Sequence, residues 1–151
     1  MNIEIVESIH ICIRKALRDE FDSIYAIDNT PGDEEERRKL ILKSLDEDNT
    51  YIALRNNQII GYIILEHSFF NRGFISMLFV ELYHRRSGIG SALIQYIEGF
   101  CKSDRIFTST NSSNKPMQDL LKKLEYNQSG IVNDLDPGDP ELFYSKKLLL
   151  Q

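Results

Sequence analysis

The sequence predicts an α/β (α+β) fold, in which a central, twisted, mixed sheet is flanked by helices. Residues 74–80 form a short apolar run typical of a buried strand, and residues 89–100 carry apolar side chains at helical spacing. Two turn signatures farther upstream separate strand-like runs, and tight turns join antiparallel strands. A strand–helix–strand crossover, by contrast, joins parallel strands. The expected sheet therefore contains both orientations.

The first fifty residues predict one strand and two helices. Residues 1–7 are expected to form an extension or an edge strand, and apolar and polar residues alternate over residues 9–14 as in a half-buried strand. Helical spacing begins at Arg18 and ends at the turn residues 29–32. Asp33 is the expected N-cap of a second helix, which begins with acidic residues and continues with basic ones, as the helix dipole favours.

Three strands are predicted in the middle of the chain, at residues 51–55, 59–66 and 74–80. Residues 55–58 form a hairpin signature, and a second turn is expected at residues 71–73. These three strands therefore run antiparallel to one another.

The remaining elements are, in order, a helix over residues 90–101, a strand over 105–110, a helix capped by Asn114 and strands over 128–132 and 141–147. The complete order is β-α-α-β-β-β-α-β-α-β-β. This order predicts about six to seven strands and about four helices in a single domain that covers residues 1–151.

Composition argues against several classes of protein. The formal net charge of −5 argues against nucleic acid as a partner and is compatible with a cationic amine substrate. Cys12 and Cys101 lie far apart, and no Cys or His stands near them at metal-ligand spacing, so no metal site is predicted. The sequence shows neither a basic-then-apolar N-terminal signal nor an apolar run of about 18 residues, so we expect a soluble cytoplasmic protein without a membrane partner.

A basic, glycine-containing turn, RRSGIG at residues 85–90, joins the central strand to the helix that follows it. A helix N-terminus offers unpaired N–H groups and the positive end of the helix dipole, which together suit a phosphate or pyrophosphate. The phosphate-loop motif is absent. The dinucleotide fingerprint is incomplete because Leu93 stands at its third glycine position.

This turn resembles the acetyl-CoA-binding motif of the GNAT superfamily of N-acetyltransferases, [QR]-x-x-G-x-[GA] after an apolar strand, here Arg85-x-x-Gly88-x-Gly90. The order of elements over residues 8–148 resembles the same family. The resemblance implies an enzyme that moves an acetyl group from acetyl-CoA to a primary amine of a small molecule, protein or peptide, by direct attack in a ternary complex.

The resemblance also implies that acetyl-CoA binds where the strands at residues 74–80 and 105–110 splay apart. Backbone groups of the central strand would bond the pantetheine amides, and the N–H groups of the turn would hold the pyrophosphate. Asn114, which already has a structural role as an N-cap, would contact the cofactor. The implied cofactor-binding residues are Leu78, Phe79, Val80, Arg85, Arg86, Ser87, Gly88, Ile89, Gly90, Ser91 and Asn114.

Transfer needs a neutral amine, an oxyanion donor and a proton for the departing thiolate. A backbone N–H near Phe79 or Val80 is the expected oxyanion donor. The tyrosine acid of well-known family members aligns with Leu121, and a catalytic glutamate of some members aligns with Ser109, so both usual groups are replaced. The remaining candidates are Glu81 and Glu66 as bases and Tyr144 as the acid.

Two other functions remain open from the sequence alone: a non-catalytic acyl-CoA-binding or regulatory module, and a protein-interaction domain that binds no CoA. Nothing in residues 33–46 identifies the acceptor, although the acidic residues within 133–141 would suit a cationic one. The family often dimerises through edge strands, so a homodimer is among the partners that the resemblance allows.

Overall fold

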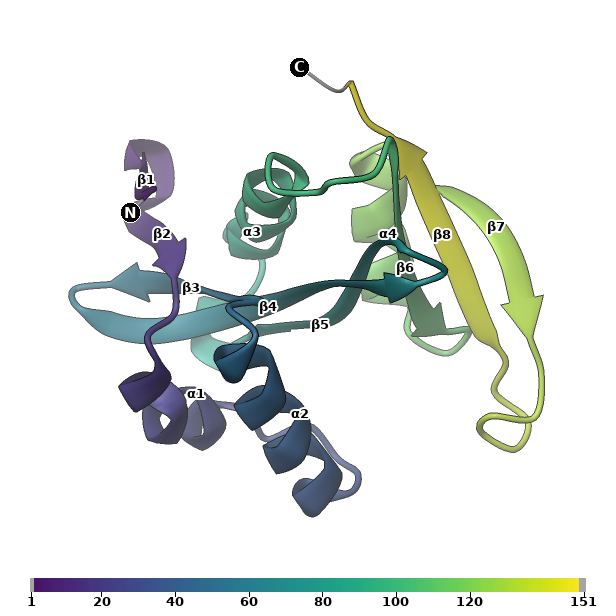
Figure 1. Ribbon diagram of the computed structural model, residues 1–151, viewed down its shortest axis with the longest axis horizontal. Helices are drawn as coiled ribbons and strands as arrows, with labels where there is room; N and C mark the ends of the chain where they lie inside the picture. The colour runs from purple at the N-terminus through teal and green to yellow at the C-terminus, as the bar shows by residue number, and fades with distance from the viewer. Residues whose placement is uncertain (1, 150–151) are drawn as a thin grey trace. The chain divides into compact units, whose positions relative to one another are not determined.

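The protein is described by a computed structural model, in which residues 2–149 form one mixed sheet and four α-helices (Figure 1). The strands are β1 (Glu4–Val6), β2 (Ile11–Lys15), β3 (Thr50–Arg55), β4 (Gln58–Phe69), β5 (Arg72–Val80), β6 (Arg105–Asn111), β7 (Asn127–Val132) and β8 (Glu141–Lys147). The helices are α1 (Phe21–Ile27), α2 (Glu34–Asp46), α3 (Ile89–Glu98) and α4 (Lys115–Lys123), with short 3-10 helices η1 (Glu7–Ile9), η2 (Arg18–Glu20) and η3 (Leu82–His84).

The strand order is β1-β2-β3-β4-β5-β6-β8-β7. All registered pairs are antiparallel except β5–β6, which is parallel as the crossover predicts. The fold class and the element order are confirmed, but the described residues contain eight strands rather than six to seven. The additional strand is β1, which pairs with β2 and lies within the segment expected to be an extension or an edge strand.

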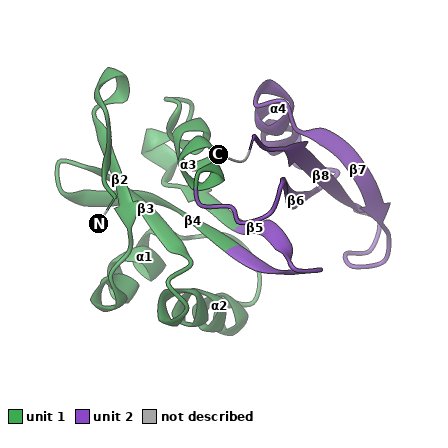
Figure 2. Cartoon of the chain, turned by 45° about the horizontal axis from the view of Figure 1, so that its top comes forward, with its two compact units in different colours: residues 1–65, 77–99 green, residues 66–76, 100–151 purple. Residues whose placement is uncertain are grey.

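The chain divides into two compact units (Figure 2). Unit 1 contains residues 1–65 and 77–99, and unit 2 contains residues 66–76 and 100–151. Strands β4 and β5 each pass from one unit into the other. A single domain over the whole chain stays a prediction. None of the helices within residues 2–149 is long and apolar enough to cross a membrane.

In unit 1, α1 and α2 cover one face of the strands and α3 covers the other (Figure 1). The apolar residues of α1 and α2 pack with those of β3, β4 and the end of β5 in one core cluster. Ile24, Ile41, Ile52 and Tyr62 in this cluster are fully buried. Burial of such side chains is the main force that holds each helix to the sheet.

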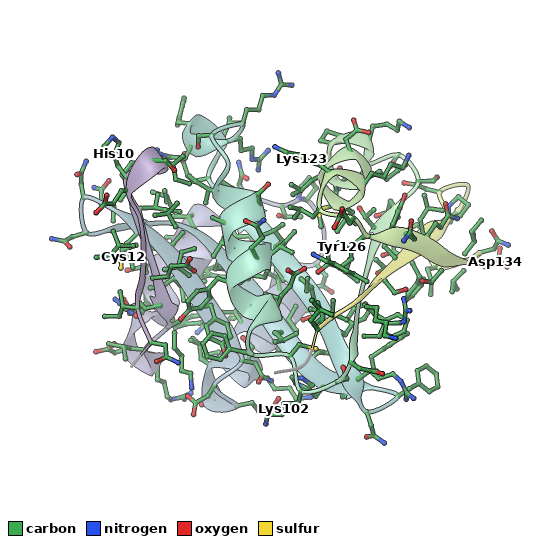
Figure 3. The ribbon with its side chains drawn as sticks, turned by 90° about the horizontal axis from the view of Figure 1, so that it is seen from above. His10, Cys12, Lys102, Lys123, Tyr126 and Asp134 are labelled. Carbon is green, nitrogen blue, oxygen red and sulfur yellow. The ribbon has the colours of Figure 1, made fainter. Side chains whose placement is uncertain are left out.

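The start of β2 differs from its prediction by two residues. The alternating pattern begins at Ile9, but Ile9 ends η1, and His10 has a left-handed backbone with φ 55° (labelled in Figure 3). A residue in this conformation cannot continue a strand, so β2 begins at Ile11. Alternation of side chains does not reveal such a turn.

Both hairpins close through two left-handed residues. The β3–β4 turn uses Asn56 and Asn57, as the sequence predicts. The β4–β5 turn uses Phe70 and Asn71, with φ 50° and 61°, so β5 already begins at Arg72. The turn predicted at residues 71–73 is therefore displaced, because a phenylalanine rarely adopts a positive φ and gave no turn signal.

Two predicted helix caps are confirmed. The Asp33 carboxylate accepts hydrogen bonds from the backbone N–H groups of Glu35 and Glu36 at the start of α2. The Asn114 side chain accepts one from the Met117 N–H at the start of α4. Each cap satisfies donors that a helix N-terminus would otherwise leave unpaired.

In unit 2, β5 and β6 form only three parallel pairs, which join residues 73–75 to residues 106–108. The Thr108 hydroxyl donates to the carbonyl oxygen of Ile75 at 2.9 Å, at the last of these pairs. Strands β6 and β8 continue side by side over seven antiparallel pairs. The Phe69 ring lies within 6 Å of the rings of three other phenylalanines on β5, β6 and β8.

Strand β7 forms one edge of the sheet, and all six of its residues are exposed. Its pairing with β8 shifts register between Gln128 and Gly130, so an extra residue interrupts the ladder there.

Candidate cofactor site and catalytic residues

The turn before α3 leaves a run of backbone donors free. Arg86 and Gly88 have left-handed backbones, with φ 62° and 88°, and no side chain in the described part of the chain caps the helix. The first helical bond runs from the Ala92 N–H to the Gly88 carbonyl. Among residues 2–149, no acceptor is found for the backbone N–H groups of residues 86–91. Such a run at a helix N-terminus fits an anion like a pyrophosphate.

The two arginines of the turn differ. The Arg85 Nε donates to the Val80 carbonyl at 2.7 Å, and its guanidinium lies 5.3 Å from the centre of the Phe79 ring. Arg85 is therefore fixed to the end of β5. Arg86 is exposed and has the left-handed backbone described above. Both arginines keep guanidinium N–H groups that can donate hydrogen bonds to a phosphate. Their role in cofactor binding stays a prediction.

The end of β5 presents alternating backbone groups. The Glu81 N–H bonds the Ile60 carbonyl of β4 at 2.7 Å, and the Phe79 carbonyl also lies close to Gly61 of β4. Because backbone groups alternate in direction along a strand, those of Leu78 and Val80 point to the edge away from β4. Both residues lie beyond the last β5–β6 pair. Of the two expected oxyanion donors, this arrangement favours the Val80 N–H.

Glu81 belongs to a chain of side-chain contacts in unit 1. Its Oε2 lies 3.5 Å from the His84 Nε2. The other ring nitrogen of His84, Nδ1, lies 2.8 Å from the Arg55 Nη1, and the Arg55 Nη2 donates to the Ile9 carbonyl at 2.7 Å. Sequence reasoning missed Arg55 and His84, because the register of β3 brings together two residues that are 29 positions apart.

The other three predicted residues, Glu66, Tyr144 and Asn114, lie in unit 2. The Glu66 Oε1 accepts a hydrogen bond from the Ser68 hydroxyl at 3.0 Å. Tyr144 is only 2% exposed and lies opposite Thr108 of β6. Asn114 is exposed apart from its capping bond. Burial gives Tyr144 a complete explanation as a core residue, and its role as an acid stays a prediction.

The two positions at which the sequence lacks the usual catalytic groups are also visible in unit 2. Leu121 is fully buried on α4. The Ser109 hydroxyl donates to the Glu141 Oε2 at 2.8 Å, so a carboxylate from β8 lies beside this position of β6. The sequence shows Glu141 only as one acid among several, because the pairing of β6 with β8 is not encoded locally.

A buried polar network fixes the segment between α1 and α2. The Tyr62 hydroxyl donates to the fully buried Asp28 carboxylate, which also accepts from the Thr30 N–H at 2.9 Å. Arg37 donates to the Thr30 carbonyl at 2.5 Å and places its Nε 4.0 Å from Asp28. Burial, and then the bond to Asp28, raises the pKa of Tyr62. This network lies beside a hollow of about 380 Å³ that Asp33, Arg37 and neighbouring residues line.

A second hollow, of about 330 Å³, lies in the loop between β7 and β8 and is lined by Asp134, Asp136 and Asp139 among others. Asp139 accepts hydrogen bonds from both Ser113 and Ser112, and these bonds, the Ser113 hydroxyl first, lower the pKa of its carboxyl group. The loop is thereby joined to the segment that precedes α4.

Comparison with known proteins defines the family. The profile of the acetyltransferase (GNAT) family matches residues 14–126. A GNAT acetyltransferase from Bacillus cereus is 36% identical, with a TM-score of 0.86 over 93% of this chain and 99% of that one. Ard1 from Thermoplasma volcanium is 16% identical, with a TM-score of 0.80 over 93% and 99% of the two chains. The protein yncA from Salmonella typhimurium, solved with acetyl-CoA, is 14% identical, with a TM-score of 0.72 over 94% and 96%. A comparison with curated proteins gives no match.

The chain therefore belongs to the GNAT family of acetyltransferases. As a member of this family it is an acetyl-CoA-dependent N-acetyltransferase, with acetyl-CoA as the acyl donor. The free donors of residues 86–91 fit that group.

Proposed function

We propose that this enzyme transfers the acetyl group directly to a primary amine of a small molecule, protein or peptide within a ternary complex. The observation that supports the proposal most is the run of unpaired N–H groups at residues 86–91, which follows by a few residues the strand end where the N–H groups of Leu78 and Val80 point away from β4. Bound acetyl-CoA supplies the thioester. Residues 86–91 hold its pyrophosphate, and the Val80 N–H stabilises negative charge on the carbonyl oxygen.

The chain must also remove a proton from the ammonium form of the acceptor, because only a neutral amine has a free electron pair. Glu81, at the end of β5, is the first candidate for this base, and its side chain is 25% exposed. Glu66 is the second candidate from the sequence, and Glu141 is a third, from its bond to Ser109. Tyr144 remains the candidate acid for the thiolate. A base must be within hydrogen-bond reach of the amine, directly or through one water.

A cationic acceptor is the class that the charges favour. Acidic side chains line the hollow in each unit, Asp33 and Glu36 in unit 1 and Asp134 and Asp136 in unit 2. The formal net charge of −5 acts in the same direction, because a negative field attracts an ammonium ion.

The alternative is an acyl-CoA-binding or regulatory module without turnover. One observation favours it: Leu121, at the position of the usual tyrosine acid, is a fully buried core residue. No hydroxyl at that position is available to protonate the thiolate.

The test combines binding with turnover. Acetyl-CoA and CoA are titrated calorimetrically into the protein, and thiol release is then followed with a panel of polyamines, amino acids and peptide amines. We expect binding of both nucleotides and turnover with at least one amine, with initial-rate lines that intersect. Parallel lines would contradict direct transfer. Binding without turnover of any amine would support the regulatory module, and a folded protein that binds neither nucleotide at millimolar concentration would contradict both.

A base is identified by the pH dependence of turnover. Glu81→Gln, Glu66→Gln and Glu141→Gln are compared with the wild type. The variant that lacks the base should lose about a hundredfold in kcat together with the acidic limb of the pH profile, while its affinity for CoA stays the same. Equal profiles in all three would assign deprotonation to water.

A further inference from the structure

The contact between Arg55 and His84 determines which nitrogen of the histidine carries the proton. A guanidinium group has five N–H donors and no acceptor. The 2.8 Å contact between the Arg55 Nη1 and the His84 Nδ1 is therefore a hydrogen bond in which Nδ1 accepts. His84 is then neutral, with its proton on Nε2, which is the atom that faces Glu81.

Arg55 and His84 together join three segments of unit 1. Arg55, at the end of β3, also donates to the carbonyl of Ile9 in η1. His84 lies in η3, and its own carbonyl accepts from the Ser87 hydroxyl at 2.6 Å. Ser87 directly precedes Gly88, the left-handed residue at the start of α3. The chain of bonds therefore runs from β3 to the turn that carries the free N–H groups.

We propose that Arg55 and neutral His84 form a latch that holds residues 81–90 in the shape that binds acetyl-CoA, and that protonation of His84 opens it. The inference rests on the proposed cofactor site. His84 is a positioning residue, since it acts on the cofactor through the turn.

Protonation would place an Nδ1–H against the Arg55 Nη1, so that two donors, each on a positively charged group, would face one another at hydrogen-bond distance. Within residues 2–149, the charged side chains found in contact with His84 are Arg55 and Glu81. In η1, Arg55 contacts the backbone carbonyl of Ile9. The titratable side chains nearest to Ile9 in the sequence are those of Glu7 and His10. Glu81 attracts a protonated His84, so the imidazolium is drawn toward Glu81 and away from Arg55.

The first test measures affinity against pH. Dephospho-CoA is the probe, because it keeps the pyrophosphate but lacks the 3′-phosphate of CoA. The second ionisation of that phosphate lies near pH 6 and would itself change binding with pH. Its Kd is measured calorimetrically from about pH 8 to about pH 5.5, the range in which histidine changes charge. We expect the wild-type affinity to fall about tenfold on acidification, the effect of losing one hydrogen bond to a charged group.

The variants separate the latch from general acid effects. In His84→Asn the amide oxygen replaces Nδ1 as the acceptor for Arg55 and cannot titrate, so affinity should stay high at both pH values. His84→Ala should be about tenfold weaker at pH 8, with little further loss in acid. His10→Asn is the matched control: it removes an exposed histidine of the same unit at a left-handed position that asparagine tolerates, and it should keep the wild-type pH dependence.

The second readout does not need a ligand. Nitrogen-15 shifts of the His84 ring in the free protein should show the Nε2–H tautomer at pH 8. The Nδ1–H tautomer, or an undiminished pH dependence in His84→Asn, would overturn the latch. A wild type that binds no dephospho-CoA at any pH, while its ring shows the expected tautomer, would instead count against the cofactor site and would overturn the part of the inference that depends on it.

Discussion

The N-termini of α3 and α4 satisfy their backbone donors in opposite ways. At α4, the Asn114 side chain accepts from the Met117 N–H, so the protein itself provides the partner. At α3, Gly88 occupies the N-cap position, and no side chain of the described residues accepts a hydrogen bond from the N–H groups of the first turn. An unpaired donor that faces water loses little, but it gains strongly when an anion arrives.

The difference shows how a sequence separates stability from binding. A capping side chain contributes about 1 kcal/mol to the folded state whether or not a ligand is present. The uncapped start of α3 gives up this contribution and adds two left-handed residues, Arg86 and Gly88. The favourable free energy of pairing these N–H groups is therefore gained only when a ligand binds. Substitutions at the two helices should therefore affect different quantities.

The largest expected effect is on binding, at α3. Gly88→Val places a β-branched side chain at φ 88°, which costs about 2 kcal/mol and should raise the Kd for acetyl-CoA about thirtyfold. Calorimetry measures the Kd, and circular dichroism verifies folding. Gly138→Val is the matched control, because Gly138 also has a positive φ, 73°, and open space around it. Equal loss of affinity in both variants would refute a specific role of the turn.

A third helix start, before α1, is fixed by an ion pair and should respond to acid. Glu20 accepts two bonds of 2.8 Å from Arg14 and a third from the Leu17 N–H. The bond from Arg14 holds the pKa of the Glu20 carboxyl below its usual range. This stabilisation is complete above the usual carboxyl pKa of about 4.3 and disappears as the pH falls through the lowered value.

Glu20→Gln should lower the free energy of unfolding by about 1.5 kcal/mol at neutral pH and flatten its decline in acid. Urea denaturation at several pH values measures both. Asp119→Asn, which changes an exposed carboxylate of α4, serves as the control and should preserve the acid dependence. An unchanged slope in Glu20→Gln would show that other carboxylates cause the acid loss.

At α4, the expected effect is on stability. Asn114→Ala removes the cap and should reduce the free energy of unfolding by about 1 kcal/mol, as measured in urea. Asn114→Asp keeps a capping oxygen, so its free energy of unfolding should stay close to that of the wild type. If Asn114 also contacts acetyl-CoA, both variants should bind acetyl-CoA more weakly. The free energy of unfolding then reports the capping role, and the Kd reports the cofactor role.

The smallest effect is expected at the other end of α4. Glu125 has φ 71° after the last helical residues, in a position that usually suits glycine. Glu125→Gly removes a steric cost of about 1–2 kcal/mol and adds an entropic cost of about 0.5–1 kcal/mol, so a gain of about 0.5 kcal/mol is expected. Glu125→Ala keeps the Cβ and should show no gain in urea denaturation. The Kd for acetyl-CoA should not change in either variant.

Local patterns were sufficient to predict much of this fold. Strand β8 has the bounds that its residues predict, and the caps Asp33 and Asn114 follow from residue type and position. The turn before α3 was also visible, because glycines and arginines between an apolar strand and an amphipathic helix form a continuous signal. The left-handed residues His10 and Phe70 gave none, since phenylalanine rarely adopts that conformation and a single histidine within an alternating pattern does not mark a turn.

The contacts between distant residues could not be predicted. Arg55 meets His84, and Ser109 meets Glu141, because strand register and pairing order place them together. Register depends on the burial of whole strands rather than on any local motif. The turn that we propose as the cofactor site is contiguous and could therefore be recognised in the sequence, while the polar partners around Glu81 could not.

The interrupted pairing of β7 has a consequence for solubility. A regular, fully exposed edge strand can pair with an edge strand of a second molecule. The exposed side chains of Ile131 and Val132 would make this pairing favourable. The extra residue between Gln128 and Gly130 breaks the spacing of free N–H and C=O groups that an incoming strand would need. Deleting Ser129 would restore that spacing, and the protein should then form fibrils or sheet-extended oligomers at concentrations at which the wild type stays dispersed.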